Sequence, residues 1–310
     1  MTTITPAPGH QVEADAPALL QARAVTMQFG GLTAVNRVDL DIRRGEIVGL
    51  IGPNGAGKTT FFNCLTGMYQ PTAGTVTFDG QVLQPKPRRV AQAGVARTFQ
   101  NIRLFSNMTA LENVMVGRYV RTRTTALHAV FRLPLHRREE GETRAAALEW
   151  LAFVGLSGQA DALSRNMSYG DQRRLEIARA LATDPRLLML DEPTAGMNPQ
   201  ETREAEALIT RIRDLGMAVL VIEHDMRFIF SLCDRVACLV RGEVLVDDVP
   251  DVVQNDPRVI EAYIGAPVEM EETPPPAGPG SLAPSKPILE MPPNAANPLL
   301  SRDERRREDR

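Results

Sequence analysis

The stretch GPNGAGKTT, residues 52–60, carries the strongest chemical signal in the chain. It fits the spacing G-x-x-x-x-G-K-[ST] through Gly52, Gly57, Lys58 and Thr59. Glycines here let backbone N–H groups close around phosphate oxygens, and a following helix adds the positive end of its dipole. The pattern predicts that Lys58 contacts the β- and γ-phosphates and that the Thr59 hydroxyl binds Mg²⁺. A plain glycine-rich turn is the alternative. The rest of the predicted loop is Pro53, Asn54, Gly55, Ala56 and Thr60.

Two acidic residues end a second apolar segment, RLLMLDEP at 186–193. Asp191 would lie at the C-terminal end of a strand, where its carboxylate is expected to hold the Mg²⁺ shell. Glu192 follows directly and could polarise an attacking water as a general base. The alternative makes Glu192 a surface carboxylate beside Pro193.

His224 ends a third apolar segment, VLVIEHD. Parallel strands of one sheet bring their C-terminal ends to the same edge, so His224 is expected near Asp191. A neutral imidazole there could contact the γ-phosphate or order the attacking water. A purely structural hydrogen bond is the alternative for this histidine.

A second stretch, NMSYGDQRRLEIARA at 166–180, also has the form of a phosphate-binding helix start. It opens with Ser168 and Gly170, and an amphipathic helical pattern follows. From this stretch alone, an ordinary helix capped by Ser168 is equally compatible.

The elements that must position these residues indicate an α/β fold. Nearly continuous apolar runs are typical of strands buried on both faces, and helical patterns lie between them. This alternation predicts a largely parallel sheet flanked by helices. The β-rich runs are 46–52, 186–193, 217–225 and 235–245, with a helical pattern at 199–216.

Two further regions differ from this core. Residues 18–45 and 75–82 predict antiparallel strands with a turn at Gly30–Gly31. Residues from about 104 to 182 are rich in helical patterns and poor in strands, which predicts a helical lobe inserted into the α/β core.

Composition limits the class of protein to which the chain can belong. Among 310 residues 43% are apolar, which is enough for one large α/β domain, and a net charge of −3 gives no support for nucleic-acid binding. The longest apolar run of the body, residues 217–222, is too short to span a membrane, and the N-terminus lacks a secretion-signal pattern. Three cysteines without a CxxC pair predict reduced, mostly buried thiols.

The chain is predicted to fold between residues 18 and 266. Residues 1–17 are polar and are interpreted as a flexible lead. The segment 267–298 holds ten of the 23 prolines and is followed by a mixed charge run. Such a composition cannot bury enough apolar surface to offset its ordering entropy, so we predict a disordered tail at 267–310.

These motifs together resemble the nucleotide-binding subunit of ABC transporters over residues 18–265. GPNGAGKTT is similar to its Walker A motif, LLMLDE to its Walker B motif with the catalytic glutamate, and MSYGDQ (167–172) to its signature. Gln100 matches the Q-loop glutamine, AGMN (195–198) the D-loop, and His224 the switch histidine. The resemblance implies a P-loop NTPase (RecA-like) core with an antiparallel β subdomain and an inserted helical lobe.

The resemblance also implies roles for single residues. In this family two ATPase subunits pack head to tail, so that Ser168 and Gly170 would bind the γ-phosphate held on the phosphate loop of a partner subunit. Phe29 would stack on adenine, where a core phenylalanine is the alternative. Gln100 would contact Mg²⁺ or the attacking water and link the site to the helical lobe, where membrane partners dock.

The sequence differs from the family motifs at four positions. The signature carries Met167, Tyr169 and Asp171 in place of leucine, glycine and glutamine, and the D-loop has Asn198 in place of aspartate. Asp171 places a carboxylate near a phosphate-binding helix start, so it either faces away or weakens that half of the composite site.

Within the family, FGGLTAVNRVDL, LDEPTAGMNPQET, IEHDM and DPRVIEAYIG resemble the larger ATPase subunit of high-affinity branched-chain amino acid importers. This implies three kinds of partner: a second ATPase subunit, two membrane permeases, and a periplasmic or extracellular solute-binding protein. No nucleic-acid partner is expected. It also implies a peripheral position on the cytoplasmic face of the bacterial inner membrane.

Other functions stay open at this point. The same branch includes importers of urea, amides and aromatic acids. Outside transport, the alternatives are a soluble ABC protein acting on ribosomes or DNA, and a regulatory module that binds ATP but hydrolyses it poorly. Six arginines without a carboxylate from Arg118 to Arg138 could face lipid headgroups or permease loops, or form a solvated face.

Overall fold

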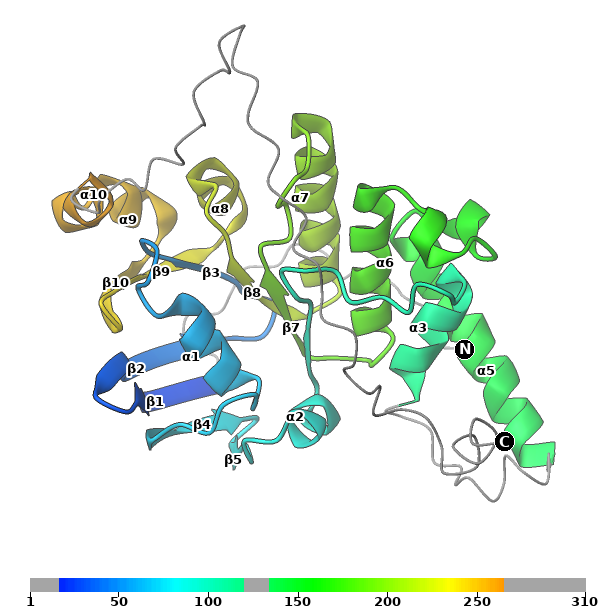
Figure 1. Cartoon of the computed structure of the whole chain (residues 1–310), viewed down its shortest axis with the longest axis horizontal. Helices are drawn as coiled ribbons and strands as arrows, with labels where there is room; N and C mark the ends of the chain where they lie inside the picture. The colour runs from blue at the N-terminus through cyan, green and yellow to red at the C-terminus, as the bar shows by residue number, and fades with distance from the viewer. Residues whose placement is uncertain (1–16, 120–133, 265–310) are drawn as a thin grey trace, which may run out of the picture. The chain divides into compact units, whose positions relative to one another are not determined.

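The computed structural model describes residues 17–119 and 134–264, which belong to one compact unit (Figure 1). No helix within these residues is long and apolar enough to cross a membrane. The predicted lead, except for its last residue, and the predicted tail at 267–310 lie outside the described residues. So does most of the arginine-rich stretch, because residues 120–133 are not described.

The main sheet confirms the predicted parallel α/β core. In the described part of the chain it has the strand order β10-β9-β3-β8-β7-β6, in which only β10 runs antiparallel to its neighbour. Every residue of β3, β7 and β8 is buried, as expected for strands covered on both faces. The strands are β3 (Ile47–Ile51), β6 (Val95–Arg97), β7 (Leu187–Asp191), β8 (Ala218–Ile222), β9 (Arg235–Val240) and β10 (Glu243–Asp248).

Alternate residues of the central strands face two apolar clusters. On β3, Ile47 and Ile51 belong to one cluster, and Val48 and Leu50 to the other. The first cluster includes helices that follow β6, and the second includes α1, α2 and the antiparallel strands. The sheet is therefore the middle layer between these two groups of elements. The helices on it are α1 (Lys58–Leu65), α2 (Pro87–Ala93), α7 (Pro199–Asp214), α8 (Met226–Leu232), α9 (Pro250–Asn255) and α10 (Pro257–Ile264).

The antiparallel sheet forms where the sequence predicts it. Its order is β2-β1-β4-β5, and β1 and β2 meet at the turn Gly30–Gly31. The predicted antiparallel region is therefore confirmed. Its strands are β1 (Leu20–Phe29), β2 (Leu32–Ile42), β4 (Ala73–Phe78) and β5 (Gln81–Val82).

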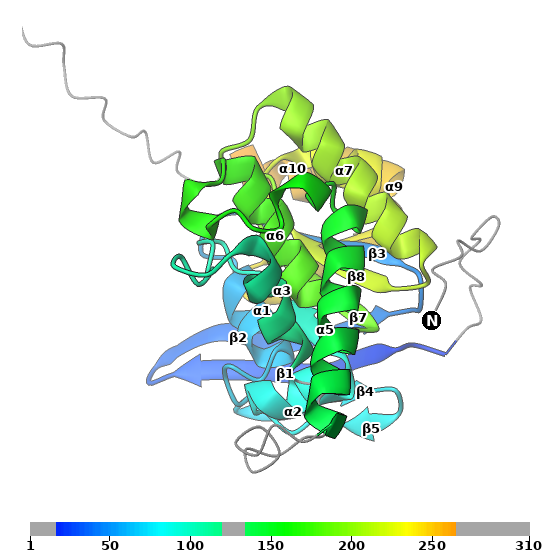
Figure 2. The same ribbon diagram turned by 90° about the vertical axis from the view of Figure 1, so that its right-hand side faces the viewer.

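The helical lobe is also present, and Figure 2 shows its three longer helices side by side. In the described residues from 104 to 182 no strand forms. Thr109 and Glu112 form a capping box that begins α3, which fixes where this helix starts. The predicted lobe is confirmed as part of the fold, while its outer limits stay predictions. It contains α3 (Ala110–Arg118), α5 (Pro134–Phe153), η1 (Ser157–Gln159), η2 (Ser164–Asn166) and α6 (Tyr169–Leu181).

The predicted β-rich run at 235–245 is confirmed, and the structure adds a turn within it. The chain reverses between β9 and β10 at Arg241 and Gly242, so the run belongs to two strands. Both turn residues have positive φ, +50° and +81°, which suits a two-residue hairpin turn.

The three cysteines are free and buried, as the sequence predicts. Burial raises the pKa of the Cys64 and Cys238 thiols to about 11. These thiols are therefore protonated at neutral pH and act as small apolar side chains.

Candidate active site

The phosphate loop joins β3 to α1, and two glycines determine its path. Gly52 has a φ of +148°, and a Cβ there would lie 2.0 Å from the carbonyl oxygen of Leu239. Gly57 has a φ of +99°, and its Cβ would lie 2.3 Å from the carbonyl oxygen of Ala34. Any larger residue would displace the backbone, so the loop requires glycine at both positions.

Lys58 is buried inside this loop. Its Nζ donates hydrogen bonds to the carbonyl oxygens of Gly52 at 2.5 Å and Pro53 at 3.1 Å. Burial lowers the pKa of Lys58, while the nearby Glu192 carboxylate acts in the opposite direction. Among the residues that the structure describes, the positive charge of Lys58 is bonded only to neutral carbonyl groups, so this position favours the binding of an anion.

The start of α1 points to the same kind of ligand. The helix has no side-chain cap, and its first hydrogen bond runs from the Phe61 N–H to the Gly57 carbonyl oxygen. The N–H groups of residues 58–60 therefore have no partner within the described residues. Together with the positive end of the helix dipole they fit a phosphate group.

Asp191 is the last residue of β7 and is buried. Burial raises the pKa of its carboxyl, and the charge of Arg97 acts against this shift. The Arg97 guanidinium lies 3.2 Å from Asp191 Oδ2 and is stacked over the rings of Phe62 and Phe99. Arg97 therefore supports a carboxylate that would be costly to bury alone.

Asp191 and Thr59 each offer an oxygen donor of the kind that binds Mg²⁺. Among the described residues, neither Oδ1 of Asp191 nor the exposed hydroxyl of Thr59 forms a hydrogen bond. Carboxylate and hydroxyl oxygens are the ligands that Mg²⁺ prefers. This donor chemistry agrees with the role that the sequence predicts for the two residues.

The Glu192 carboxylate is contacted by side chains from two other segments of the chain, those of Gln100 and His224. Its Oε1 lies 2.8 Å from His224 Nε2, and its Oε2 accepts a hydrogen bond from Gln100 Nε2 at 2.9 Å. The Glu192 backbone has a φ of +48°, and its N–H donates to the carbonyl oxygen of Ile222 on the next strand. A non-glycine residue in this conformation is strained, so the surrounding contacts hold it there. The structure thus brings together the three residues predicted to manage the attacking water.

Sequence reasoning missed Glu223, which organises the loop around this group. This buried carboxylate accepts hydrogen bonds from the N–H of Thr194 at 2.7 Å, the Thr194 hydroxyl at 2.6 Å and the N–H of His224 at 3.0 Å. The one signal in the sequence for the role of Glu223 is its position, as a charged residue between an apolar strand and His224.

Arg173 is a second missed residue, since its place in an amphipathic helix suggests a surface position. Its guanidinium is completely buried and donates to the carbonyl oxygens of Phe99 at 2.6 Å and Gln100 at 2.7 Å. It also forms an ion pair with Glu176 at 3.1 Å. Arg173 therefore ties α6 to the segment that carries Gln100.

The signature residues begin α6. Ser168 is the N-cap, and its hydroxyl accepts the N–H of Asp171 at 3.2 Å. The Asp171 carboxylate accepts hydrogen bonds from Gln159 at 3.1 Å and Arg174 at 2.6 Å. Burial acts to raise the pKa of Asp171, but these bonds outweigh it and lower the pKa. Asp171 is thus paired within the lobe.

The other residues that differ from the family motifs also form contacts within the chain. The Tyr169 hydroxyl accepts a hydrogen bond from Arg173 at 3.2 Å, and its ring lies next to Gly196 of the D-loop. The Asn198 side chain caps α7 by accepting the N–H groups of Gln200 and Glu201. Gly170 is buried, and a Cβ there would lie 3.0 Å from Glu201 Oε1.

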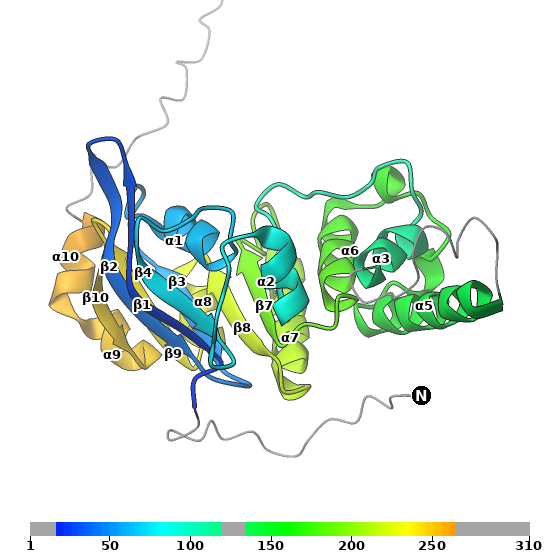
Figure 3. The same cartoon turned by 90° about the horizontal axis from the view of Figure 1, so that it is seen from below.

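The structure does not bring Ser168 and Gly170 to the phosphate loop of the same chain. Figures 1 and 3 both show strands of the main sheet between α1 and α6. Within the described residues no hydrogen bond links Ser168 or Gly170 to residues 52–60. The two phosphate-binding patterns therefore form separate surfaces on one chain.

Phe29 lies at the end of β1 and is 44% exposed, which excludes the alternative of a core phenylalanine. Its ring meets that of Tyr69 edge to face, with centroids 5.5 Å apart. An exposed aromatic ring with one supported edge presents a face on which a base could stack.

The replacement Phe29→Ala is expected to weaken ATP binding about 10-fold, because base–aromatic stacking is worth about 1–3 kcal/mol. Titration with a fluorescent ATP analogue measures this change. The matched control is Leu32→Ala, which removes a 67% exposed apolar side chain from the same hairpin and should leave affinity unchanged. Equal affinity in Phe29→Ala and the wild type would contradict the adenine contact.

Comparison with known proteins agrees with this geometry. Residues 35–195 match the family model described as ABC transporter, and residues 243–269 match a model described as branched-chain amino acid ATP-binding cassette transporter. The high-affinity branched-chain amino acid transport ATP-binding protein BraF of Pseudomonas aeruginosa is 47% identical over 80% of this chain and 98% of its own length. The corresponding protein LivG of Escherichia coli is 46% identical over the same shares.

A solved structure supports the same assignment. The ADP conformation of an ATP-binding cassette from an ABC transporter superposes with a TM-score of 0.71 at 29% identity, covering 81% of this chain and all of that one. The phosphate loop, the acidic pair, the glutamine, the histidine and the signature helix thus occur in a chain whose sequence and fold agree with one family. The chain belongs to the ABC transporter family of ATPases.

Proposed function

We propose that this chain hydrolyses ATP to drive uptake of branched-chain amino acids through a membrane transporter. The observation that carries the proposal is Glu192, which is held by Gln100 and His224 at the end of a buried strand. A carboxylate restrained on both oxygens beside a phosphate loop is placed to accept a proton from water.

Each residue then has a part in the reaction. The phosphate loop and Lys58 bind the β- and γ-phosphates of ATP, and Phe29 stacks on its adenine. Glu192 takes the proton of the attacking water, and His224 orders that water or contacts the γ-phosphate. Thr59, Asp191 and Gln100 would hold Mg²⁺, partly through water, and the bound ion neutralises charge on the phosphate oxygens.

The signature completes the site of a second subunit. Ser168 is exposed and lies apart from the phosphate loop of its own chain, so it is available, with the backbone at Gly170 beside it, to the ATP bound by a partner. The N-terminus of α6 supplies backbone N–H groups and the positive end of a helix dipole to that phosphate. The partner is a second, related ATPase subunit or a second copy of this chain.

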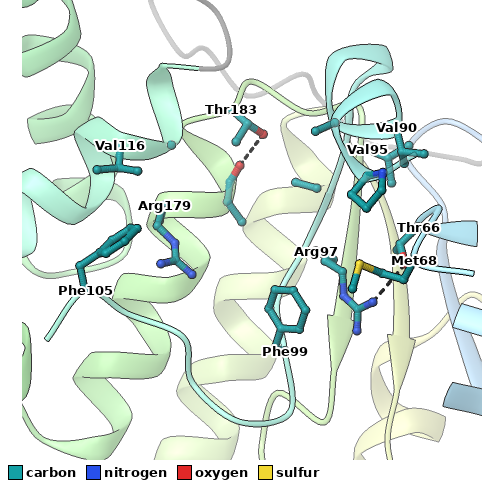
Figure 4. A pocket seen from close by; sticks show the side chains of 15 residues that line it. Thr66, Met68, Val90, Val95, Arg97, Phe99, Phe105, Val116, Arg179 and Thr183 are labelled. Atoms are coloured by element: carbon teal, nitrogen blue, oxygen red, sulfur yellow. Dashed lines mark hydrogen bonds between the residues drawn. The ribbon is translucent and has the colours of Figure 1, made fainter. Parts of the chain in front are cut away.

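A cavity beside the Gln100 segment supports contact with a permease. It measures about 380 Å³ and lies between α2, β6, α3 and α6. Figure 4 shows Phe99 and Phe105 of the Gln100 segment in its wall, together with Arg97 and Arg179. A helix with apolar and acidic side chains fits this lining. The chain would thus lie peripherally on the cytoplasmic face of the inner membrane, bound to two permeases.

The solute is proposed from the relatives. BraF and LivG are named for branched-chain amino acid transport, and this chain covers almost their whole length. The second family model, at residues 243–269, bears the same description. A solute-binding protein on the outer side would deliver leucine, isoleucine or valine to the permeases.

Uptake by the reconstituted transporter tests this proposal. Proteoliposomes that contain both ATPase subunits, the permeases, the solute-binding protein and internal ATP are expected to accumulate labelled leucine. Isoleucine and valine should compete with it, and urea, short amides and aromatic acids should not. Accumulation of urea or an amide without leucine would show that the chain serves another importer of the same branch.

A further inference from the structure

The C-terminal helices reach back to the phosphate loop. Helix α9 packs against α8, β9 and β10, and α10 packs against α9 and β10. Val253 of α9 and Val259 of α10 are buried in this contact. The described part of the segment that matches the branched-chain-type family model, residues 243–264, is thus built onto β9, the neighbour of β3.

Tyr263 is the residue that makes the connection. It lies one helical turn after Val259 and therefore on the same, inward face of α10. Ile260 and Ile264 on the other side of the helix are 46% and 77% exposed. The Tyr263 hydroxyl oxygen accepts a hydrogen bond from the backbone N–H of Gly52 at 2.6 Å.

This bond fixes the N–H side of a residue, Gly52, whose carbonyl side is held by Lys58 of the site itself. The N–H of Gly52 donates to Tyr263, and its carbonyl oxygen accepts from the Lys58 ammonium. A Cβ on Gly52 would lie 2.0 Å from the carbonyl oxygen of Leu239, so this backbone passes close to β9 and leaves no room for a side chain. Burial raises the pKa of the Tyr263 phenol, with the Cys238 thiol acting in the same direction, and the phenol stays neutral.

We infer that Tyr263 is a positioning residue for nucleotide binding, which holds the first peptide of the phosphate loop so that Lys58 and the loop N–H groups face the phosphates. The inference rests on the proposed ATP site. The inference gives the C-terminal segment a role in nucleotide binding, because the Tyr263 phenol affects ATP through Gly52 and does not contact the nucleotide.

The replacement Tyr263→Phe tests this role in the full-length chain, because it keeps the ring and removes only the acceptor. Affinity for a fluorescent ATP analogue should fall about 3- to 10-fold, the range expected for one hydrogen bond to a partly buried N–H. The KM for ATP should rise by a similar factor, and kcat at saturating ATP should stay within about twofold, since the loop still closes when ATP is abundant. Hydrogen exchange of the Gly52 amide should become faster.

A matched pair of variants separates positioning from mere stability. Val259→Ala loosens the packing of α10 but keeps the phenol, so it should lower the melting temperature and leave Gly52 exchange unchanged. Ile264→Ala alters an exposed side chain and should change neither property.

Two results would overturn the inference. One is wild-type ATP affinity and wild-type Gly52 exchange in Tyr263→Phe. The other is a loss of affinity in Tyr263→Phe that Val259→Ala reproduces at an equal drop in melting temperature. A wild-type chain that bound no ATP would instead contradict the proposed nucleotide site, and exchange at Gly52 would still show whether the phenol holds the loop.

Discussion

Replacing Glu192 by glutamine is expected to lower ATP turnover at least about 100-fold, because a positioned general base contributes about 10²–10⁴-fold to a rate. The amide has the same shape but cannot accept the proton of water. ATP binding should persist, since Glu192 forms its contacts with Gln100 and His224 and the loop around Lys58 is unchanged. The unhydrolysed nucleotide should then hold two ATPase subunits together.

Phosphate release under single-turnover conditions measures the first effect, and light scattering with and without ATP measures the second. Glu149→Gln is the control, because this exposed carboxylate on α5 lies outside the site and its replacement should preserve turnover. Equal turnover in the wild type and Glu192→Gln would exclude Glu192 as the base. Absent turnover in both would favour a regulatory module that binds ATP without hydrolysing it.

Replacing Lys58 by alanine is expected to weaken ATP binding about 100-fold. The change removes a buried ammonium whose hydrogen bonds to phosphate are charge-assisted and are worth about 1.5–3 kcal/mol. It also leaves the carbonyl oxygens of Gly52 and Pro53 without their donor. Turnover at physiological ATP should be lost as a consequence.

Calorimetric titration with ATP and Mg²⁺ measures this loss. The chain has three lysines, and Lys86→Ala provides a control with the same change of net charge, because Lys86 is exposed at the start of α2. Its affinity should match that of the wild type. Unchanged binding in Lys58→Ala would show that the phosphates bind elsewhere.

The positions of these side chains can be predicted from the sequence where local features determine them. The loop at 52–60 is specified by glycines that alone can adopt its backbone, and Lys58 follows them directly. Asp191 and His224 end apolar runs that have to be central strands, and parallel strands deliver their last residues to one edge. The contact between His224 and Glu192 is a consequence of sheet topology, which the apolar pattern already indicates.

The remaining parts depend on contacts that no local pattern encodes. Tyr263 and Gly52 are 211 residues apart in the chain. Arg173 belongs to a helix whose pattern would place an arginine in solvent, yet it is buried against two carbonyl groups. Strand β6 has three residues, which is too short for any periodicity to be visible.

The turn between β9 and β10 shows a different limit. Residues 235–245 look like one long strand because β-forming residues continue on both sides of Arg241 and Gly242. The reversal depends on two consecutive positive φ angles, and an arginine at the first of them gives no warning in the sequence. Gly242 alone could have suggested it.

The two restraints on Glu192 come from different parts of the fold. His224 is carried by the end of a core strand, whereas Gln100 is carried by a segment that the Arg173 guanidinium fastens to α6 and hence to the lobe. If the lobe tilts, the glutamine travels with it and the histidine stays behind. Both carboxylate oxygens are engaged in the arrangement described here, and a lobe that moved relative to the core would free Oε2 from Gln100 while His224 stayed on Oε1.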